Sequence, residues 1–143
     1  MSTVSLLLLL VFSSMPLSKE SWSIPTFTSS SQQPRKFDEY TDTPSNDAKA
    51  RLDNFAVELQ NDPRVKGYII AYGGRSCPNK AEAYAEFDRS YLVSNRGIDG
   101  SRIVVVNGGR RSDASRYTLA LWLVPEGGSA PAPSPTLKRR CPR

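Results

Sequence analysis

Regular hydrophobic patterns occur only in the middle of the chain, between Lys36 and Gly127. Two segments there repeat apolar residues every three or four positions, which is the spacing of one helix face. Other segments are short apolar runs rich in β-branched and aromatic residues, which are typical of strands. In chain order the pattern predicts an edge strand at 36–40, a helix at 46–61, a buried strand at 67–72, a helix at 80–96, and buried strands at 102–107 and 117–124.

Residue types that favour helix ends frame both predicted helices. Ser45 or Asn46 can cap the first helix. Pro63 forces it to end, because proline has no backbone donor and disfavours helical geometry in the residue before it. Asn79 lies three residues before a glutamate, which is the spacing of a capping box for the second helix. We expect that helix to end at Gly97, with the glycine in the left-handed conformation.

The second helix carries aromatic and acidic side chains, which we expect on different faces. The aromatic members of its apolar stripe are Tyr84, Phe87 and Tyr91, which we assign to the core. The acidic residues are Glu82, Glu86 and Asp88, which we assign to a solvated face. Nothing in the sequence around these carboxyl groups would raise their pKa, so we do not expect them to act as acid or base catalysts.

The order of elements, β-α-β-α-β-β, predicts an α/β fold, specifically an α+β two-layer sandwich. Each strand-helix-strand passage favours parallel strands with a right-handed crossover. We therefore expect a four-stranded mixed sheet with both helices on one face. The last strand, 117–124, is apolar at nearly every position, so we place it inside the sheet and expect a hairpin-like connection to the strand before it.

The chain begins with an apolar run, Ser5–Phe12, which is too short to cross a bilayer as a helix but has the length of the central part of a secretory signal. Small residues around Trp22 form a plausible cleavage site. We expect a signal peptide at 1–23, a linker at 24–35, an extracytoplasmic location, and no membrane span in the mature chain. No Lys or Arg precedes the run, so an uncleaved anchor or a different start codon remains open.

The formal net charge of +5 does not come from the predicted domain. Residues 36–127 contain 13 Lys and Arg and 13 Asp and Glu, so this region is neutral. Most of the excess lies in the Pro-rich tail at 128–143, in Lys138, Arg139, Arg140 and Arg143. Binding to nucleic acid through phosphates requires a basic face, so we do not expect a nucleic-acid partner.

The only two cysteines are Cys77 and Cys141. Export would place them where disulfides persist, and a bond between them would close a loop worth on the order of 4 kcal/mol in the chain-entropy model. Two reduced thiols are the alternative. Cys77 also lies near a helix start and Arg75, which could lower its pKa and make a reactive thiol.

Arginines and glycines follow the two strands that we expect to be parallel. Since parallel strands finish at the same end of a sheet, where open α/β sheets commonly bind ligands, five residues should gather there: Gly73, Gly74, Arg75, Arg110 and Arg111. A guanidinium group suits a carboxylate or phosphate. The alternative is three solvated loop arginines, paired with Asp113 or with nothing.

Catalytic machinery is not apparent in the sequence. The chain has no histidine, so a serine or cysteine nucleophile would lack its commonest base. We also find no cluster of metal-ligand residues and no nucleotide-binding loop, because the glycines at 73–74 lack the Gly-Lys-Ser/Thr ending. We therefore expect no enzyme activity, no metal and no cofactor.

The segment Tyr91–Ile103, which reads YLVSNRGIDGSRI, resembles the helix-turn-strand of the OmpA-like C-terminal domain, the peptidoglycan-binding module of bacterial envelope proteins. The first-helix segment Ala50–Leu59 and the strand end at Tyr68–Gly74 are similar as well. The likeness covers roughly 37–124 and implies the same fold. In that family an aspartate in the loop after the second strand and an arginine in the following helix grip the wall peptide. Here the loop has no acid, and the arginine's position holds Tyr84.

These features lead to two hypotheses. The first is an exported, noncatalytic cell-envelope module of OmpA-like fold, whose loops at the strand ends bind peptidoglycan or another acidic envelope component. The second is a secreted scaffold that contacts its partner through the basic, Cys-containing tail. A redox-active thiol enzyme is a third and weaker reading.

Overall fold

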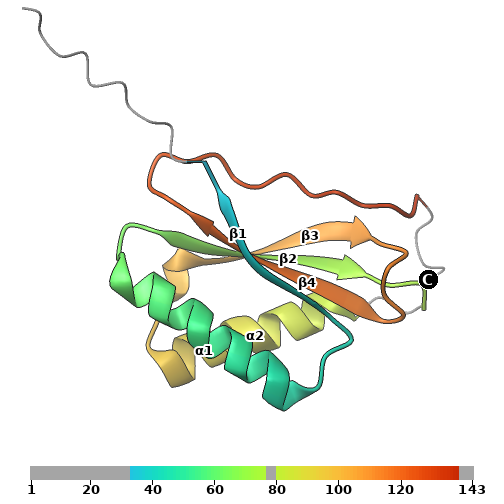
Figure 1. Ribbon diagram of the computed structural model, residues 1–143, viewed down its shortest axis with the longest axis horizontal. Coiled ribbons are helices and arrows are strands. Elements are labelled where there is room, and N and C mark those ends of the chain that lie inside the picture. Colours follow the sequence, from blue (N-terminus) through green and yellow to red (C-terminus); the bar gives the residue numbers. More distant parts are fainter. Residues whose placement is uncertain (1–32, 77–79, 139–143) are drawn as a thin grey trace, which may run out of the picture.

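The computed structural model describes residues 33–76 and 80–138 (Figure 1). Its elements are β1 (Arg35–Thr41), α1 (Ser45–Asn61), β2 (Lys66–Gly73), α2 (Ala81–Arg96), the short 3-10 helix η1 (Gly100–Arg102), β3 (Ile103–Arg110) and β4 (Tyr117–Val124). All six predicted helices and strands are therefore present. The predicted signal peptide, the two cysteines and the last five residues lie outside the described residues.

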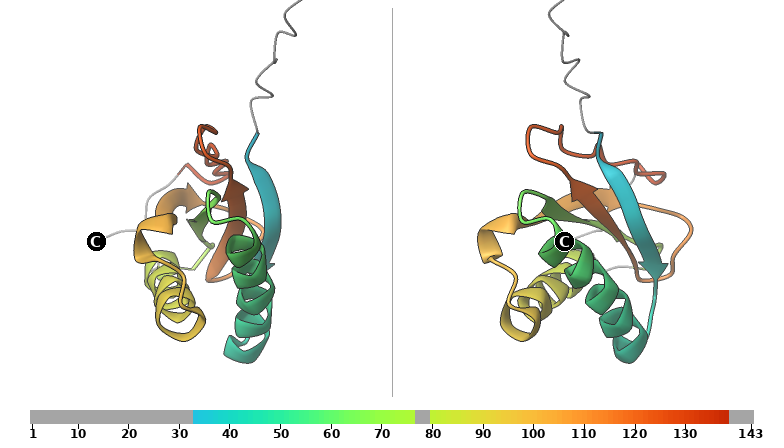
Figure 2. Two further views of the ribbon diagram at one scale, coloured as in Figure 1. Left: turned by 90° about the vertical axis from the view of Figure 1, so that its left-hand side faces the viewer. Right: turned by 60° about the vertical axis from the view of Figure 1, so that its left-hand side comes forward.

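The four strands form one mixed sheet in the order β1-β4-β2-β3. Strands β2 and β3 are parallel neighbours, whereas β4 runs antiparallel to both β1 and β2. Both helices pack on the same face of the sheet (Figure 2). The predicted two-layer α/β sandwich with a four-stranded mixed sheet is confirmed.

The expected hairpin-like connection between the last two strands is wrong. β4 does not pair with β3 but lies between β1 and β2. Its composition explains the position, because seven of its eight residues are buried and such a strand is stable only where both sheet faces are covered. The interior position predicted for it is confirmed.

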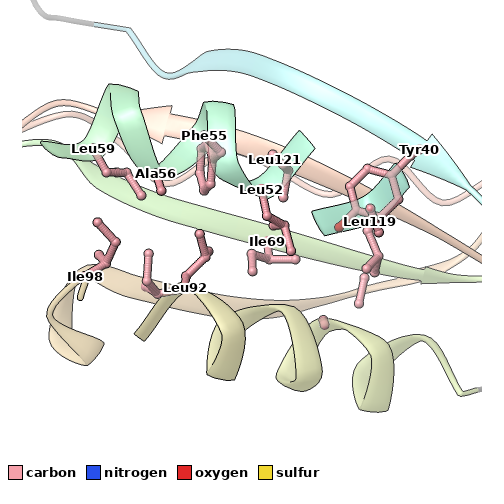
Figure 3. Close-up of a cluster of buried hydrophobic side chains, with 14 of the residues drawn as sticks. Tyr40, Leu52, Phe55, Ala56, Leu59, Ile69, Leu92, Ile98, Leu119 and Leu121 are labelled. Carbon is pink, nitrogen blue, oxygen red and sulfur yellow. The ribbon is translucent and has the colours of Figure 1, made fainter. Parts of the chain in front are cut away.

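A single hydrophobic cluster fills the space between the helices and the sheet (Figure 3). Leu52, Phe55 and Leu59 from α1 meet Leu92 from α2 over Ile69 of β2, and all five side chains are fully buried. Tyr40 lies at one end of this cluster, far from Leu59 and Ile98 at the other end (Figure 3). The candidate sites lie at the Tyr40 end of the cluster.

The opposite face of the sheet carries a smaller cluster made of Ile70, Tyr72 and Ala120, with Trp122 packed against it. Residues 125–138, here called the C-terminal strap, run along this side of the molecule (Figure 1). The backbone N–H of Ser134 donates to the Tyr72 hydroxyl at 3.2 Å, which ties the strap to this face. The described part of the predicted Pro-rich tail is thus an extended segment with a contact to the sheet.

The helix starts differ from the predicted ones. Pro44 occupies the position before α1 and makes no side-chain cap, so the expected caps Ser45 and Asn46 are themselves helical. Lys80 occupies the corresponding position before α2, also without a side-chain cap, and the expected cap Asn79 lies outside the described residues. Gly97 does follow α2 in the left-handed conformation, at φ 68°, as predicted.

The end of α1 is held by Arg102 of η1, which is 43 positions from Leu59 in the sequence. The Arg102 guanidinium donates to the backbone carbonyls of Leu59 at 2.7 Å, Asp62 at 2.9 Å and Val65 at 2.7 Å. The last carbonyls of a helix have no partner inside the helix, so these bonds satisfy groups that would otherwise need water. Arg102 thereby fixes the turn that leads from α1 into β2.

Neither helix in the described part of the chain is long and apolar enough to cross a membrane.

Candidate functional site

Two loops at one end of the sheet are joined beyond the last paired strand residues. Gly73, the end of β2, is the register partner of Tyr117, the start of β4. The following loop continues this pairing through the backbone, because the N–H groups of Gly74, Arg75 and Ser76 donate to the carbonyls of residues 116, 114 and 115 at 2.8, 3.0 and 2.7 Å. The Arg75 backbone is therefore held in a fixed place.

Arg110 acts inside this loop cluster. Its guanidinium donates to the Gly74 carbonyl at 2.8 Å and to the Arg75 carbonyl at 2.8 Å. These bonds close the end of β3 against the loop after β2. The predicted gathering of Arg110 with Gly74 and Arg75 is present in the structure, with the Arg110 guanidinium used to hold the loop.

Arg111 is engaged by acidic and aromatic neighbours. It forms ion pairs with Glu39 at 2.9 Å and Asp113 at 2.5 Å, and its guanidinium carbon lies 5.0 Å from the centre of the Tyr72 ring. Burial opposes ionisation of Glu39, but hydrogen bonds from Lys36 and Arg111 outweigh it and hold the pKa of Glu39 below its usual value. Arg111 thus pairs with Asp113, as the alternative reading expected.

Arg75 differs from the other two arginines, because it is exposed and its side chain has no ion pair among the described residues. Its guanidinium is the one in this group that is accessible to an anion. All five predicted residues therefore lie at one end of the sheet, but their roles divide. Gly73, Gly74 and Arg110 form the loop framework, Arg111 is internally paired, and Arg75 faces solvent.

The C-terminal strap ends beside the same loops. Its residues Thr136 and Leu137 both donate backbone hydrogen bonds to the Arg110 carbonyl, at 2.9 and 3.0 Å. Leu137 also forms an isolated antiparallel bridge with Arg110. The next residue, Lys138, is exposed. Lys138, the first basic residue of the tail, therefore follows a residue that Arg110 holds near the Arg75 backbone.

A cavity of about 390 Å³ opens at this end of the sheet, on the side of the helices. It lies between the start of α1, the first half of α2 and the strands β1 and β4. Its apolar wall includes Ala48, Ala83, Tyr84, Phe87, Tyr117 and Leu119. Its charged residues are Lys49, Lys80 and Asp88. No cavity was predicted at this place.

Asp88 was expected on a solvated face, and this prediction is wrong. The residue is 6% exposed, and its Oδ2 accepts a hydrogen bond from the Tyr40 hydroxyl. Burial raises the pKa of Asp88 to about 6, although the bond from Tyr40 lowers it. Burial likewise raises the pKa of Tyr40. A carboxyl group with a perturbed pKa in a cavity is a candidate for ligand contact.

The burial of Asp88 could have been found from helical spacing. Asp88 shares a three- and four-residue spacing with Ala81, Ala85 and Leu92, and these four are the buried residues of α2. Phe87, which we assigned to the core, is 57% exposed. Side-chain chemistry was given more weight than position, and the two neighbouring residues were consequently placed on the wrong faces.

Tyr84 is half-buried on the cavity side of α2. Here its ring stacks on Tyr117 with ring centres 4.2 Å apart and an interplanar angle of 23°. Both rings line the cavity. The position is therefore part of an aromatic wall.

Within residues 33–76 and 80–138, no three His, Cys, Asp or Glu side chains are grouped so that they could hold a metal ion. No protein-family model matches the chain, and no curated protein shows significant similarity to it.

Proposed function

We propose that this chain is an exported, noncatalytic module of the cell envelope that binds an acidic partner, with peptidoglycan as the first candidate, at the end of the sheet that carries Arg75. The observation behind the proposal is that Arg110 connects two basic elements. Its guanidinium holds the Arg75 backbone, while its carbonyl holds Leu137, the residue before Lys138. Both positive groups therefore extend from one fixed framework.

The charge balance supports a local anion site. Arg111 is neutralised by Glu39 and Asp113, and Arg116 pairs with Asp42. Arg75 and Lys138 have no such partner among the described residues, so positive charge is left at this end of a neutral domain. An exposed guanidinium can form two parallel bonds to one carboxylate, and wall peptides carry free carboxylates. The resemblance of Tyr91–Ile103 to the OmpA-like module makes peptidoglycan the first candidate, but the two ligand-binding residues of that family are missing here.

The alternative function remains a secreted scaffold that binds through the basic tail alone. The exposure of Lys138 favours it, as does the concentration of basic residues in 138–143. In this case the folded domain would serve to present the tail, and Arg75 would not contribute.

Retention on purified peptidoglycan separates the two functions. The full chain, the Arg75→Ala variant and a chain lacking residues 138–143 would be compared in a sedimentation assay. If the envelope proposal is correct, the Arg75→Ala variant is retained several-fold less than the wild type. Loss of retention only in the truncated chain would instead support the scaffold.

Arg64→Ala is the matched control, because Arg64 is an exposed arginine just before β2, at the opposite end of that strand from Arg75. It removes the same charge from the molecule without changing the proposed site. Equal retention of the wild type, Arg75→Ala and the truncated chain would overturn both functions. Thermal unfolding of each variant would show that the fold is intact.

A further inference from the structure

The cavity beside Tyr40 has the features of a small-molecule site. Its volume of about 390 Å³ lies in the range of natural ligand pockets, which run from about 300 to 1,000 Å³. Its walls are mostly apolar, and the stacked rings of Tyr84 and Tyr117 form a flat surface. Phe87 adds an aromatic side chain that is 57% exposed, although it belongs to the wall. A ligand would cover this ring.

The polar groups of the cavity lie at separate places and have unused bonding capacity. Asp88 uses Oδ2 for the bond from Tyr40, whereas Oδ1 has no hydrogen-bond partner among the described residues. Lys49 and Lys80 line the cavity and form no ion pair in the described part of the chain, where the Lys49 ammonium instead lies 5.8 Å from the centre of the Tyr91 ring. Asp88 is buried, Lys49 is half-buried and Lys80 is exposed, so the acid lies deeper than the lysines.

We propose that this cavity binds a small apolar molecule that carries an amine or another hydrogen-bond donor at its buried end and an anionic group at its outer end. The donor would meet Asp88 Oδ1, the body would lie along the Tyr84 and Tyr117 rings, and the anion would face Lys49 and Lys80. This site is separate from the proposed acidic-partner site at Arg75 and does not depend on it.

The arrangement of charges decides between ligand classes. A purely cationic ligand would meet the two lysines at the entrance, and a purely anionic one would meet the Asp88 carboxylate inside. Like charges brought together in a low-dielectric site repel strongly. A molecule with opposite polar ends avoids both conflicts. The cavity therefore selects for a hydrogen-bond donor at the buried end and an anion at the outer end, as well as for an apolar body.

The test uses 4-(aminomethyl)benzoate as the probe, because it has an ammonium group, an aromatic body and a carboxylate in a line. Benzylamine and benzoate are the two truncated probes. Amide NMR spectra of the full chain would be recorded during each titration. We expect saturable shifts at Ala83, Tyr84 and Tyr117 with the two-ended probe, which should bind more tightly than either truncated probe.

Variants of Asp88 and of the two lysines test which protein group binds each end of the probe. Asp88→Asn keeps an acceptor for the Tyr40 hydroxyl but removes the negative charge. It should weaken the binding of 4-(aminomethyl)benzoate by at least about tenfold, since hydrogen bonds to charged groups contribute roughly 1.5–3 kcal/mol. The same variant should not weaken the binding of benzoate. The Lys49→Met/Lys80→Met double variant should weaken the binding of 4-(aminomethyl)benzoate and of benzoate, but not that of benzylamine.

Glu86→Gln is the control, because Glu86 is an exposed acid on the same helix that does not line the cavity. It should leave every affinity unchanged. The proposal is overturned if 4-(aminomethyl)benzoate gives no saturable shift up to its solubility limit, or if Asp88→Asn and Glu86→Gln affect it equally. Retention on peptidoglycan would be measured on the same Asp88→Asn sample, and it should stay at the wild-type level because Arg75 is untouched.

Discussion

The Tyr40 hydroxyl donates a hydrogen bond to the Asp88 carboxylate across a sequence separation of 48 residues. The bond connects the edge strand β1 to α2, two elements that otherwise meet mainly through the shared hydrophobic cluster. It is also the one direct hydrogen bond to Asp88 in the described structure, so the two side chains depend on each other. The contribution of the Tyr40–Asp88 pair to the free energy of unfolding should therefore depend on pH.

The first prediction concerns the pH dependence of stability. The pKa of Asp88 is about 6 in the folded chain, against the ordinary aspartate value of 3.8 in the unfolded chain, so the folded state binds more protons between these pH values. The stability due to the protonated carboxyl is therefore complete below about pH 4 and is lost as the pH rises through 6. Asp88→Asn removes this titration. The difference in unfolding free energy between wild type and variant should favour the wild type by about 2 kcal/mol more at pH 4 than at pH 8.

Urea unfolding at a series of pH values would measure this difference. Other carboxyl groups with lowered pKa values, such as those of Asp42 and Asp53, titrate equally in both proteins and cancel in the comparison. Parallel stability curves for the wild type and Asp88→Asn would show that the Asp88 pKa is not raised.

The second prediction concerns Arg102. Replacement by alanine leaves the carbonyls of Leu59, Asp62 and Val65 without these donors, and unsatisfied buried polar groups cost about 1–3 kcal/mol each when water cannot reach them. We expect Arg102→Ala to lower the unfolding free energy by at least about 2 kcal/mol. Arg102→Lys should rescue only part of it, because an ammonium group lacks the planar fork of donors.

Arg64→Ala supplies the comparison for Arg102, measured by the same chemical unfolding. Its side chain is 72% exposed and pairs with Asp62 at the surface, so its loss should cost no more than about 0.5 kcal/mol. If both variants lose the same small amount, the Arg102 bonds do not stabilise the fold.

The third prediction concerns Gly108. A Cβ atom built there would lie 2.5 Å from the Tyr72 ring and 2.8 Å from Ile70, which is closer than carbon atoms approach in proteins. We expect Gly108→Ala to destabilise the fold by about 1–3 kcal/mol, because the packed ring must move. Gly100→Ala is the control, since its nearest atom would be 3.5 Å away. Melting temperatures should fall for the first variant only.

The fourth prediction concerns the disulfide between Cys77 and Cys141, both of which lie outside the described residues. Arg75, two residues before Cys77, accepts a hydrogen bond from Arg110, and Leu137, four residues before Cys141, donates one to it. Four residues can span up to about 14 Å, so the described anchors are within reach of a bond. We expect the protein from its native host to lack the signal peptide and two hydrogens.

Intact mass measured before and after reduction would test the disulfide and signal removal together. If the bond forms, Cys77→Ser should lower the unfolding free energy by up to about 4 kcal/mol under oxidising conditions and should have no comparable effect after reduction. Two thiols that react with an alkylating reagent in the unreduced native protein would rule out the pair.

Much of the fold could be predicted because local patterns determine it. The β-branched runs, the stop at Pro63 and the turn at Gly97 act within a few residues, and the structure has a strand or a helix end at each of them. The predicted hairpin-like connection between the last two strands was wrong. Which neighbour β4 pairs with depends on contacts between residues more than 40 positions apart, and no local pattern in Tyr117–Val124 encodes it.

The candidate site was predicted only in outline. The position of Arg75 and Arg110 at one sheet end follows from the parallel strands, but the use of the Arg110 guanidinium by backbone carbonyls depends on loop geometry. The sequence predicts only a Pro-rich tail where the strap lies, because this segment is rich in proline and small residues. Its contacts with Tyr72 and Arg110 use backbone donors, which every non-proline residue has, and composition alone therefore cannot reveal them.

The central place of β4 has a consequence for how the molecule is made. Within the described sheet β1 pairs only with β4, so this edge strand has no partner until the ribosome has synthesised the residues that separate the two strands, 88 positions between the paired ends Arg35 and Leu123. A nascent chain that stops before Tyr117 can form the parallel β2–β3 pair but cannot close the sheet. The four-stranded sheet should therefore form only after the whole of β4 has been synthesised.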